Sequence, residues 1–216
     1  VGASEADVLP LLIGGVSIAA VNGPSSVVLS GVEDDVAAVV EACVERGWRT
    51  HRLRVSHAFH SVLMEPMLAE FASAIEGLTF APPSIPLVST VTGARITDEM
   101  TDPSYWVGQV RETVRFADAV AAMADSGVSR FAEVGPDAVL TPMIAQTLDD
   151  AQAGAGAVAP VLAPLARRGR ADVSAALGGV AGLFVAGAHV DWAGLYTGTG
   201  AQRIDLPTYA FQRQRY

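Results

Sequence analysis

The sequence predicts an α/β protein in two parts, a small α+β unit followed by alternating helices and strands. Near the start of the chain, short β-branched runs are separated by turn residues and followed by one amphipathic helix. Later, helical periodicity alternates with apolar runs that stop at Thr-Gly or Gly-Pro, which is typical of a parallel sheet covered by helices. Half of the 216 residues are apolar, so the chain can fill a hydrophobic core.

The small unit is predicted over residues 14–56. Its first two strands are separated by the turn signal Asn22-Gly23-Pro24. The predicted elements are, in chain order, strands over residues 16–21 and 27–29, an amphipathic helix capped by Asp34 or Asp35 and ended by Gly47, and a strand over residues 50–55. This order of elements favours a ferredoxin-like arrangement.

The larger part is predicted over residues 57–165 as helices packed on a parallel sheet. Its elements are, in chain order, an amphipathic helix that ends at Gly77, a strand over residues 87–91, a helix over residues 111–125, and strands over residues 130–134 and 161–163. The Ala/Gly-rich residues 151–159 predict a flexible loop. Residues 166–216 predict a closing helix over 173–186 and an aromatic tail that docks onto another surface.

Composition and charge exclude several classes of partner. The net charge of −9 argues against nucleic acid or an anionic membrane surface as the main partner, and no apolar run has membrane-spanning length. The single cysteine, Cys43, cannot form an internal disulfide and leaves too few thiols for a structural zinc site, so a reducing cytoplasm is expected. The first residues lack the features of a signal peptide and an initiator methionine, so we expect Val1 to continue a longer polypeptide.

The strongest candidates for chemistry are His57 and His60, in a polar loop between a predicted strand and a predicted helix. Their spacing alone leaves two alternatives open: a general base, because imidazole titrates near neutral pH, or ordinary loop histidines with satisfied hydrogen bonds. Metal binding has little support, because no third ligand lies at suitable spacing nearby. Residues 133–136, Glu-Val-Gly-Pro, end a predicted strand, which suits a binding loop as well as a simple strand stop.

Five segments, in order and over nearly the whole chain, resemble one family, the acyltransferase domains of modular type I polyketide synthases (malonyl-CoA:acyl-carrier-protein transacylases). They are residues 16–31, His57-Ala58-Phe59-His60-Ser61, residues 105–116, the Glu-Val-Gly-Pro strand and loop at 131–140, and the linker at 206–216. The resemblance implies three parts: a ferredoxin-like small subdomain at 14–56, the C-terminal part of an α/β-hydrolase-like large subdomain at 57–165, and a closing helix with a post-acyltransferase linker at 166–216.

The resemblance also implies roles for individual residues. His60 is the general base and acid of a Ser-His pair, and the main-chain carbonyl of Gln109 holds its second ring nitrogen. His57 and Phe59 match the positions that select the extender unit, since the family's malonyl enzymes carry His-Ala-Phe-His and its methylmalonyl enzymes Tyr-Ala-Ser-His. The Gly-x-Ser-x-Gly turn that presents the nucleophile does not occur in this sequence. Ser61 adjoins His60 and is expected to cap the next helix.

The implied reaction moves a malonyl group from malonyl-CoA to a serine, and then to the phosphopantetheine thiol of an acyl carrier protein. It needs no metal and no tightly bound cofactor. The expected partners are the carrier protein, the upstream half of the acyltransferase and the ketosynthase of the same synthase, and the chain alone is expected to be inactive. Two alternatives stay open: a serine hydrolase or thioesterase fragment on the same scaffold, and a non-catalytic piece that docks the carrier protein.

Overall fold

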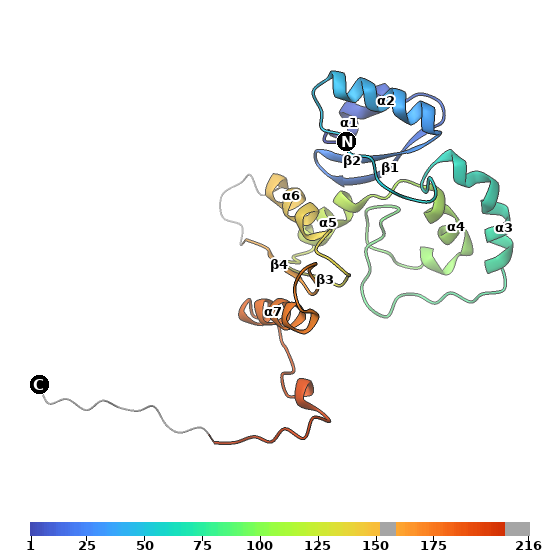
Figure 1. The fold of residues 1–216 in the computed structure, drawn as a ribbon. Helices are drawn as coiled ribbons and strands as arrows, with labels where there is room; N and C mark the ends of the chain where they lie inside the picture. The colour runs from blue at the N-terminus through green and yellow to red at the C-terminus, as the bar shows by residue number, and fades with distance from the viewer. Residues whose placement is uncertain (152–158, 206–216) are drawn as a thin grey trace, which may run out of the picture.

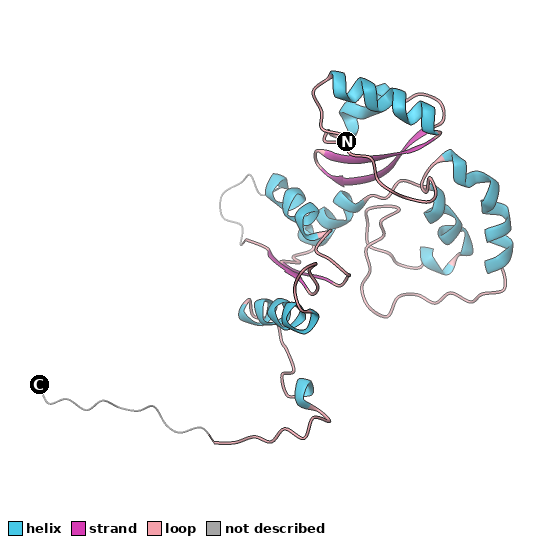
Figure 2. Cartoon of the chain, viewed as in Figure 1, coloured by secondary structure: helices cyan, strands magenta, loops and turns pink. Residues whose placement is uncertain are grey.

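Residues 1–151 and 159–205 are described by the computed structural model, and their elements form three groups along the chain (Figure 1). The first group is a β-hairpin with helices beside it, the second a pair of helices joined by a long loop, and the third a small parallel sheet with its helices. Figure 2 shows that this long loop leaves one helix of the pair, runs around the second group and returns to the other helix, α4 (Pro103–Arg111). No helix within the described ranges is long and apolar enough to cross a membrane.

The N-terminal group is built on an antiparallel hairpin of β1 (Val16–Gly23) and β2 (Ser26–Gly31). The short helix α1 (Glu5–Val8) and the turn η1 (Leu9–Leu11) precede it, and α2 (Glu33–Glu45) follows it. The apolar face of α2 packs on the hairpin, with Cys43 fully buried, and this burial raises the pKa of the Cys43 thiol. The two predicted strands and the predicted helix are therefore confirmed.

Other predictions for this group were wrong. Residues 50–55 form no strand, and Val55 is 71% exposed, because no strand of the described residues pairs with their main-chain groups. The edge of β1 away from β2 carries one parallel bridge, between Ala20 and Val114. Helix α2 begins at Glu33, so Asp34 and Asp35 lie inside its first turn and do not cap the helix. Their negative charges interact favourably with the positive end of the helix dipole. In the described residues the sheet of this group has two strands, β1 and β2, so the structure does not confirm a ferredoxin-like arrangement.

The second group pairs α3 (Glu65–Ile75) with α4. The turn η2 (Val62–Met64) leads into α3, which ends just before Gly77 as predicted. The predicted strand at residues 87–91 is reduced to one antiparallel bridge between Val88 and Arg95, because the chain turns back on itself too soon for a longer pairing. A short turn, η3 (Glu99–Thr101), precedes α4. The sequence pattern did not predict the helix α4.

The third group confirms the predicted parallel pairing. β3 (Arg130–Glu133) and β4 (Val161–Pro164) pair in parallel, and α5 (Phe116–Asp125), α6 (Thr141–Ala151) and α7 (Asp172–Val185) pack around them. The core of this group consists of Val120, Phe131, Ile144 and Leu148. The predicted helix at 111–125 starts only at Phe116, because Arg111 still belongs to α4 and Val114 pairs with β1. A final turn, η4 (Gly194–Tyr196), follows α7. The tail at 206–216 and nearly all of the loop predicted at 151–159 lie outside the described residues.

Glu133 at the end of β3 fixes the loop that leads into α6. The side chain is 8% exposed, and its carboxylate accepts hydrogen bonds of 2.6–2.8 Å from the N–H groups of Val139, Leu140 and Thr141 and from the Thr141 hydroxyl. Burial by itself raises the pKa of Glu133, but the hydrogen bonds favour the charged form and hold this pKa below its ordinary value. The sequence pattern identified Glu133 only as part of a strand end.

The lowered pKa of Glu133 gives a pH-dependent stability. A carboxylate whose folded pKa lies below its unfolded value stabilises the fold at neutral pH, and this contribution is lost as the pH falls from about 4.3 through the folded value. We expect Glu133→Gln to lower the free energy of unfolding by about 1–3 kcal/mol at neutral pH, and by less in acid. Urea unfolding of the complete domain at neutral and at acidic pH measures the two free energies of unfolding, with exposed Glu45→Gln as the control. An equal effect of Glu133→Gln at both pH values would contradict the assignment.

Candidate active site

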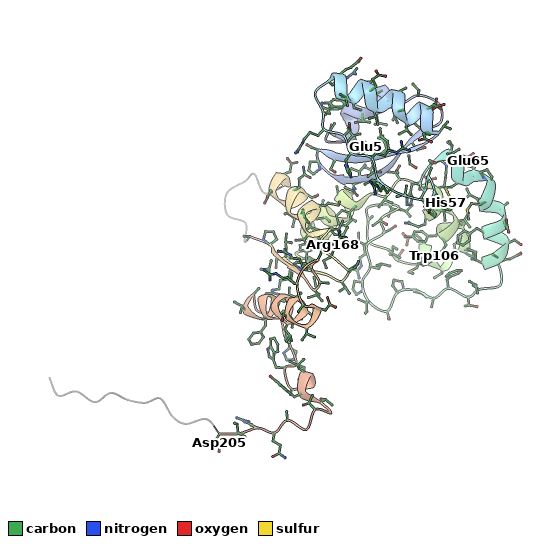
Figure 3. The ribbon with its side chains drawn as sticks, viewed as in Figure 1. Glu5, His57, Glu65, Trp106, Arg168 and Asp205 are labelled. Atoms are coloured by element: carbon green, nitrogen blue, oxygen red, sulfur yellow. The ribbon has the colours of Figure 1, made fainter. Side chains whose placement is uncertain are left out.

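His60 lies in the loop between the N-terminal group and α3, in a backbone conformation that is rare for its residue type. Its φ of 59° is the only positive value for a non-glycine residue in the described chain. Such a conformation is strained and persists only where the surroundings hold it. Here the His60 N–H donates to the carbonyl oxygen of Val110, at the end of α4, over 3.1 Å. In Figure 3 the labelled His57, which belongs to the same loop, lies near the place where this loop meets α4.

The His60 ring is held by a second contact to the same segment. Its Nδ1 lies 2.8 Å from the main-chain carbonyl oxygen of Glu112. A carbonyl oxygen can only accept a hydrogen bond, so Nδ1 carries the proton. In the neutral ring Nε2 is then the acceptor, which is the tautomer that a general base needs.

The prediction that Gln109 supplies this carbonyl was wrong. Gln109 lies in the last turn of α4, where main-chain carbonyls run along the helix axis. Glu112 is the C-cap residue, and its extended backbone (φ −75°, ψ 155°) turns its carbonyl out of the helix. The sequence carries no glycine or proline at this helix end, so its position could not be found from local signals.

The segment after Glu112 is fastened to β1. Thr113 Oγ1 donates to the carbonyl oxygen of Ile18 over 2.6 Å. The Val114 N–H donates to the Ala19 carbonyl over 2.9 Å, and the Val114 carbonyl accepts from the Val21 N–H over 2.8 Å. The carbonyl that orients His60 therefore stands between α4 and the N-terminal hairpin. Sequence reasoning missed both Glu112 and Thr113.

The structure brings the other two predicted site residues to the same place. The ring centroids of His57 and Phe59 are 5.9 Å apart, and those of Phe59 and His60 are 6.4 Å apart. The Phe59 side chain is 49% exposed, so its ring presents a surface next to His60 that a substrate could contact. His57 Nδ1 lies 2.9 Å from the hydroxyl of Ser56.

Ser61 is the helix cap that the sequence predicted. It is fully buried, its hydroxyl donates to the Ala58 carbonyl over 2.6 Å, and the same oxygen accepts from the Leu63 N–H over 3.2 Å. A buried hydroxyl whose proton is already donated to a carbonyl is a poor candidate for a nucleophile. In residues 1–151 and 159–205, no three side chains of His, Cys, Asp or Glu gather closely enough to hold a metal ion.

Comparison with known proteins agrees with this geometry. A family model described as the acyl transferase domain matches residues 5–190. Polyketide synthase GfsB of Streptomyces halstedii is 49% identical over the whole chain, which covers 4% of that protein. The spectinabilin polyketide synthase system protein NorB of Streptomyces orinoci is 47% identical over 99% of the chain, which covers 10% of that protein.

Solved structures give the same result. The acyltransferase domain from the second module of the salinomycin polyketide synthase superposes with a TM-score of 0.86 at 45% identity, over 97% of this chain and 48% of that one. The malonyl-CoA:acyl carrier protein transacylase of Xanthomonas oryzae pv. oryzae gives a TM-score of 0.71 at 28% identity, over 87% and 56% of the two chains. The chain thus spans about half of these domains and a small part of the synthases. Its α/β fold and its sequence show that the chain belongs to the acyltransferase domains of polyketide synthases.

Proposed function

We propose that this chain supplies the catalytic histidine of an acyltransferase that carries malonyl groups from coenzyme A to an acyl carrier protein through a serine ester. The observation that carries the proposal is the contact from His60 Nδ1 to the Glu112 carbonyl. This contact fixes the ring and leaves Nε2 as the proton acceptor. Its rigid support by two secondary-structure elements is the kind of preorganisation that acid–base catalysis uses.

In the first half-reaction, His60 Nε2 takes the proton of the serine hydroxyl while the serine oxygen attacks the thioester carbonyl carbon. The tetrahedral oxyanion collapses, the carbon–sulfur bond breaks, and His60 returns the proton to the coenzyme A sulfur. In the second half-reaction, His60 takes the proton of the phosphopantetheine thiol, whose sulfur attacks the serine ester. The serine oxygen then leaves with the proton from His60. Each half-reaction restores the neutral ring.

The serine is proposed to come from a segment outside these 216 residues. No Gly-x-Ser-x-Gly turn occurs in the sequence, and the hydroxyl of Ser61 is buried and engaged. Apolar side chains around the His-rich loop and after β3 are exposed, among them Val55, Phe59 and Val134. Exposed apolar residues near a site are typical of a surface that another part of the protein covers. The chain also spans only 48% of the solved salinomycin domain, which leaves room for such a segment.

Malonyl preference is proposed from the position of Phe59. The Phe59 ring lies 6.4 Å, centroid to centroid, from the His60 ring. An acyl group that reacts beside Nε2 of His60 has its α carbon next to the attacked carbonyl. A benzyl side chain at position 59 restricts the space for a methyl group on that carbon, whereas a serine there would leave the space open.

The role of His60 predicts a large loss of rate in one variant. In the complete acyltransferase domain, His60→Ala should slow acyl-enzyme formation from radiolabelled malonyl-CoA by about 10²–10⁴-fold, because a positioned general base is removed. His57→Ala should be much milder. Exposed His189→Ala, beyond α7, serves as the matched control and should keep the parent rate. Circular dichroism checks that the variants fold, and full labelling of a folded His60→Ala variant would refute the assignment.

The role of Phe59 predicts a change of selectivity. Combining His57→Tyr with Phe59→Ser should reduce the preference for malonyl-CoA over methylmalonyl-CoA by about 10–200-fold, which is what one methyl group in a close-fitting pocket is worth. Competition between the two thioesters gives the ratio of kcat/KM values. Phe184→Ser on α7 is the control, because Phe184 is half-exposed like Phe59 but lies elsewhere in the fold. A parent enzyme that already prefers methylmalonyl-CoA would show that Phe59 does not exclude the methyl group.

A further inference from the structure

The carbonyl that orients His60 belongs to the peptide unit shared by Glu112 and Thr113. A peptide unit is planar, so the Glu112 carbonyl oxygen and the Thr113 nitrogen rotate together. On one side the unit is attached to the Cα of Glu112, and the N–H of Glu112, which belongs to the preceding peptide unit, donates to the Gly108 carbonyl over 2.8 Å and closes α4. Whatever fixes Thr113 on the other side therefore sets the direction of the Glu112 carbonyl.

The Thr113 side chain provides that second attachment. Its hydroxyl donates to the Ile18 carbonyl over 2.6 Å, a short hydrogen bond between partners 95 positions apart in the chain. Ile18 is buried in the hairpin core, so the acceptor is itself well held. The register of β1 shifts just after Ile18, and Ala19, which has no register partner on β2, accepts the Val114 N–H instead.

We propose that Thr113 is a positioning residue for His60, an inference that rests on the proposed role of His60 as the base. The hydroxyl of Thr113 ties the Glu112–Thr113 peptide to β1, and the Glu112 carbonyl in turn selects the Nδ1–H tautomer of His60. A valine at position 113 keeps the volume but has no donor. Without the donor the peptide unit can rotate, and Nε2 carries the proton in part of the molecules.

The effect should fall on the chemical step and on the histidine ring. In the complete domain, Thr113→Val should lower the single-turnover rate of acyl-enzyme formation about tenfold, which is the scale of one lost hydrogen bond. The KM for malonyl-CoA should change by less than about twofold, because Thr113 does not contact the substrate in this account. ¹⁵N NMR of the histidine rings should show His60 moving from the Nδ1–H form to a mixture of tautomers. Thr113→Ser, which keeps the hydroxyl, should restore both readouts.

The matched control is Thr147→Val. Thr147 is a threonine whose hydroxyl, like that of Thr113, donates to a carbonyl, that of Met143 over 3.0 Å. Thr147 is buried and lies in α6, whereas Thr113 is partly buried. This variant should lose stability without changing the His60 tautomer or the rate. If Thr113→Val does not fold, Thr113→Cys replaces it, because a thiol is a weak donor, and the same results are expected.

Two results would overturn the proposal about Thr113: an unchanged His60 tautomer in Thr113→Val, or a loss of rate no larger than that in Thr147→Val. The His60→Ala variant separates this failure from failure of the proposed function. If His60→Ala keeps the full acylation rate, His60 is not the base, and the NMR readout still decides whether Thr113 fixes the ring. If His60→Ala is inactive and Thr113→Val behaves like the control, only the inference about Thr113 is lost.

Discussion

The hydrogen bond from His60 Nδ1 to the Glu112 carbonyl is the contact on which the functional geometry depends. It joins the His-rich loop to the end of α4, and through Val114 to the N-terminal hairpin. The acceptor is a neutral main-chain oxygen, not a carboxylate. This oxygen has no proton to gain or lose, so its preference for the Nδ1–H tautomer of the neutral ring does not depend on the titration of the acceptor. A strained backbone at His60 is maintained by the same segment.

Two loops of the chain are shaped by the same physical means, polar groups that satisfy the free ends of helices. Ser61 supplies its oxygen to the Leu63 N–H at the start of η2, immediately after His60. Glu133 gathers three N–H groups at the entry to α6. In each case one buried side chain replaces water as the partner of main-chain groups, so the loop keeps one conformation. This cap lies directly beside His60, whose Nδ1 contacts the Glu112 carbonyl.

Local signals in the sequence predicted much of the fold. The periodicity of α2, α3 and α7 and the parallel pairing of β3 with β4 were predicted, as was the cap at Ser61. The strand predicted at 50–55 would need a partner strand from elsewhere in the chain, and no strand of the described residues pairs with it. Gln109 came from the resemblance to the family, which gives a position in a motif but not the conformation of a helix end. The extended backbone of Glu112 after α4 is what presents the carbonyl to His60. The sequence itself pointed to His57 and His60, the resemblance to the family added Phe59, and the structure places the three rings together.

The most direct test of the account is to locate the acyl group. The 216-residue chain is incubated with radiolabelled malonyl-CoA alone, and again with the remaining half of the acyltransferase domain, and the label is mapped by mass spectrometry. The account predicts no covalent label on the chain alone. It predicts label on a serine of the added half, which disappears when the chain carries His60→Ala. Label on any residue of the 216-residue chain, with Ser61 the first to examine, would contradict it.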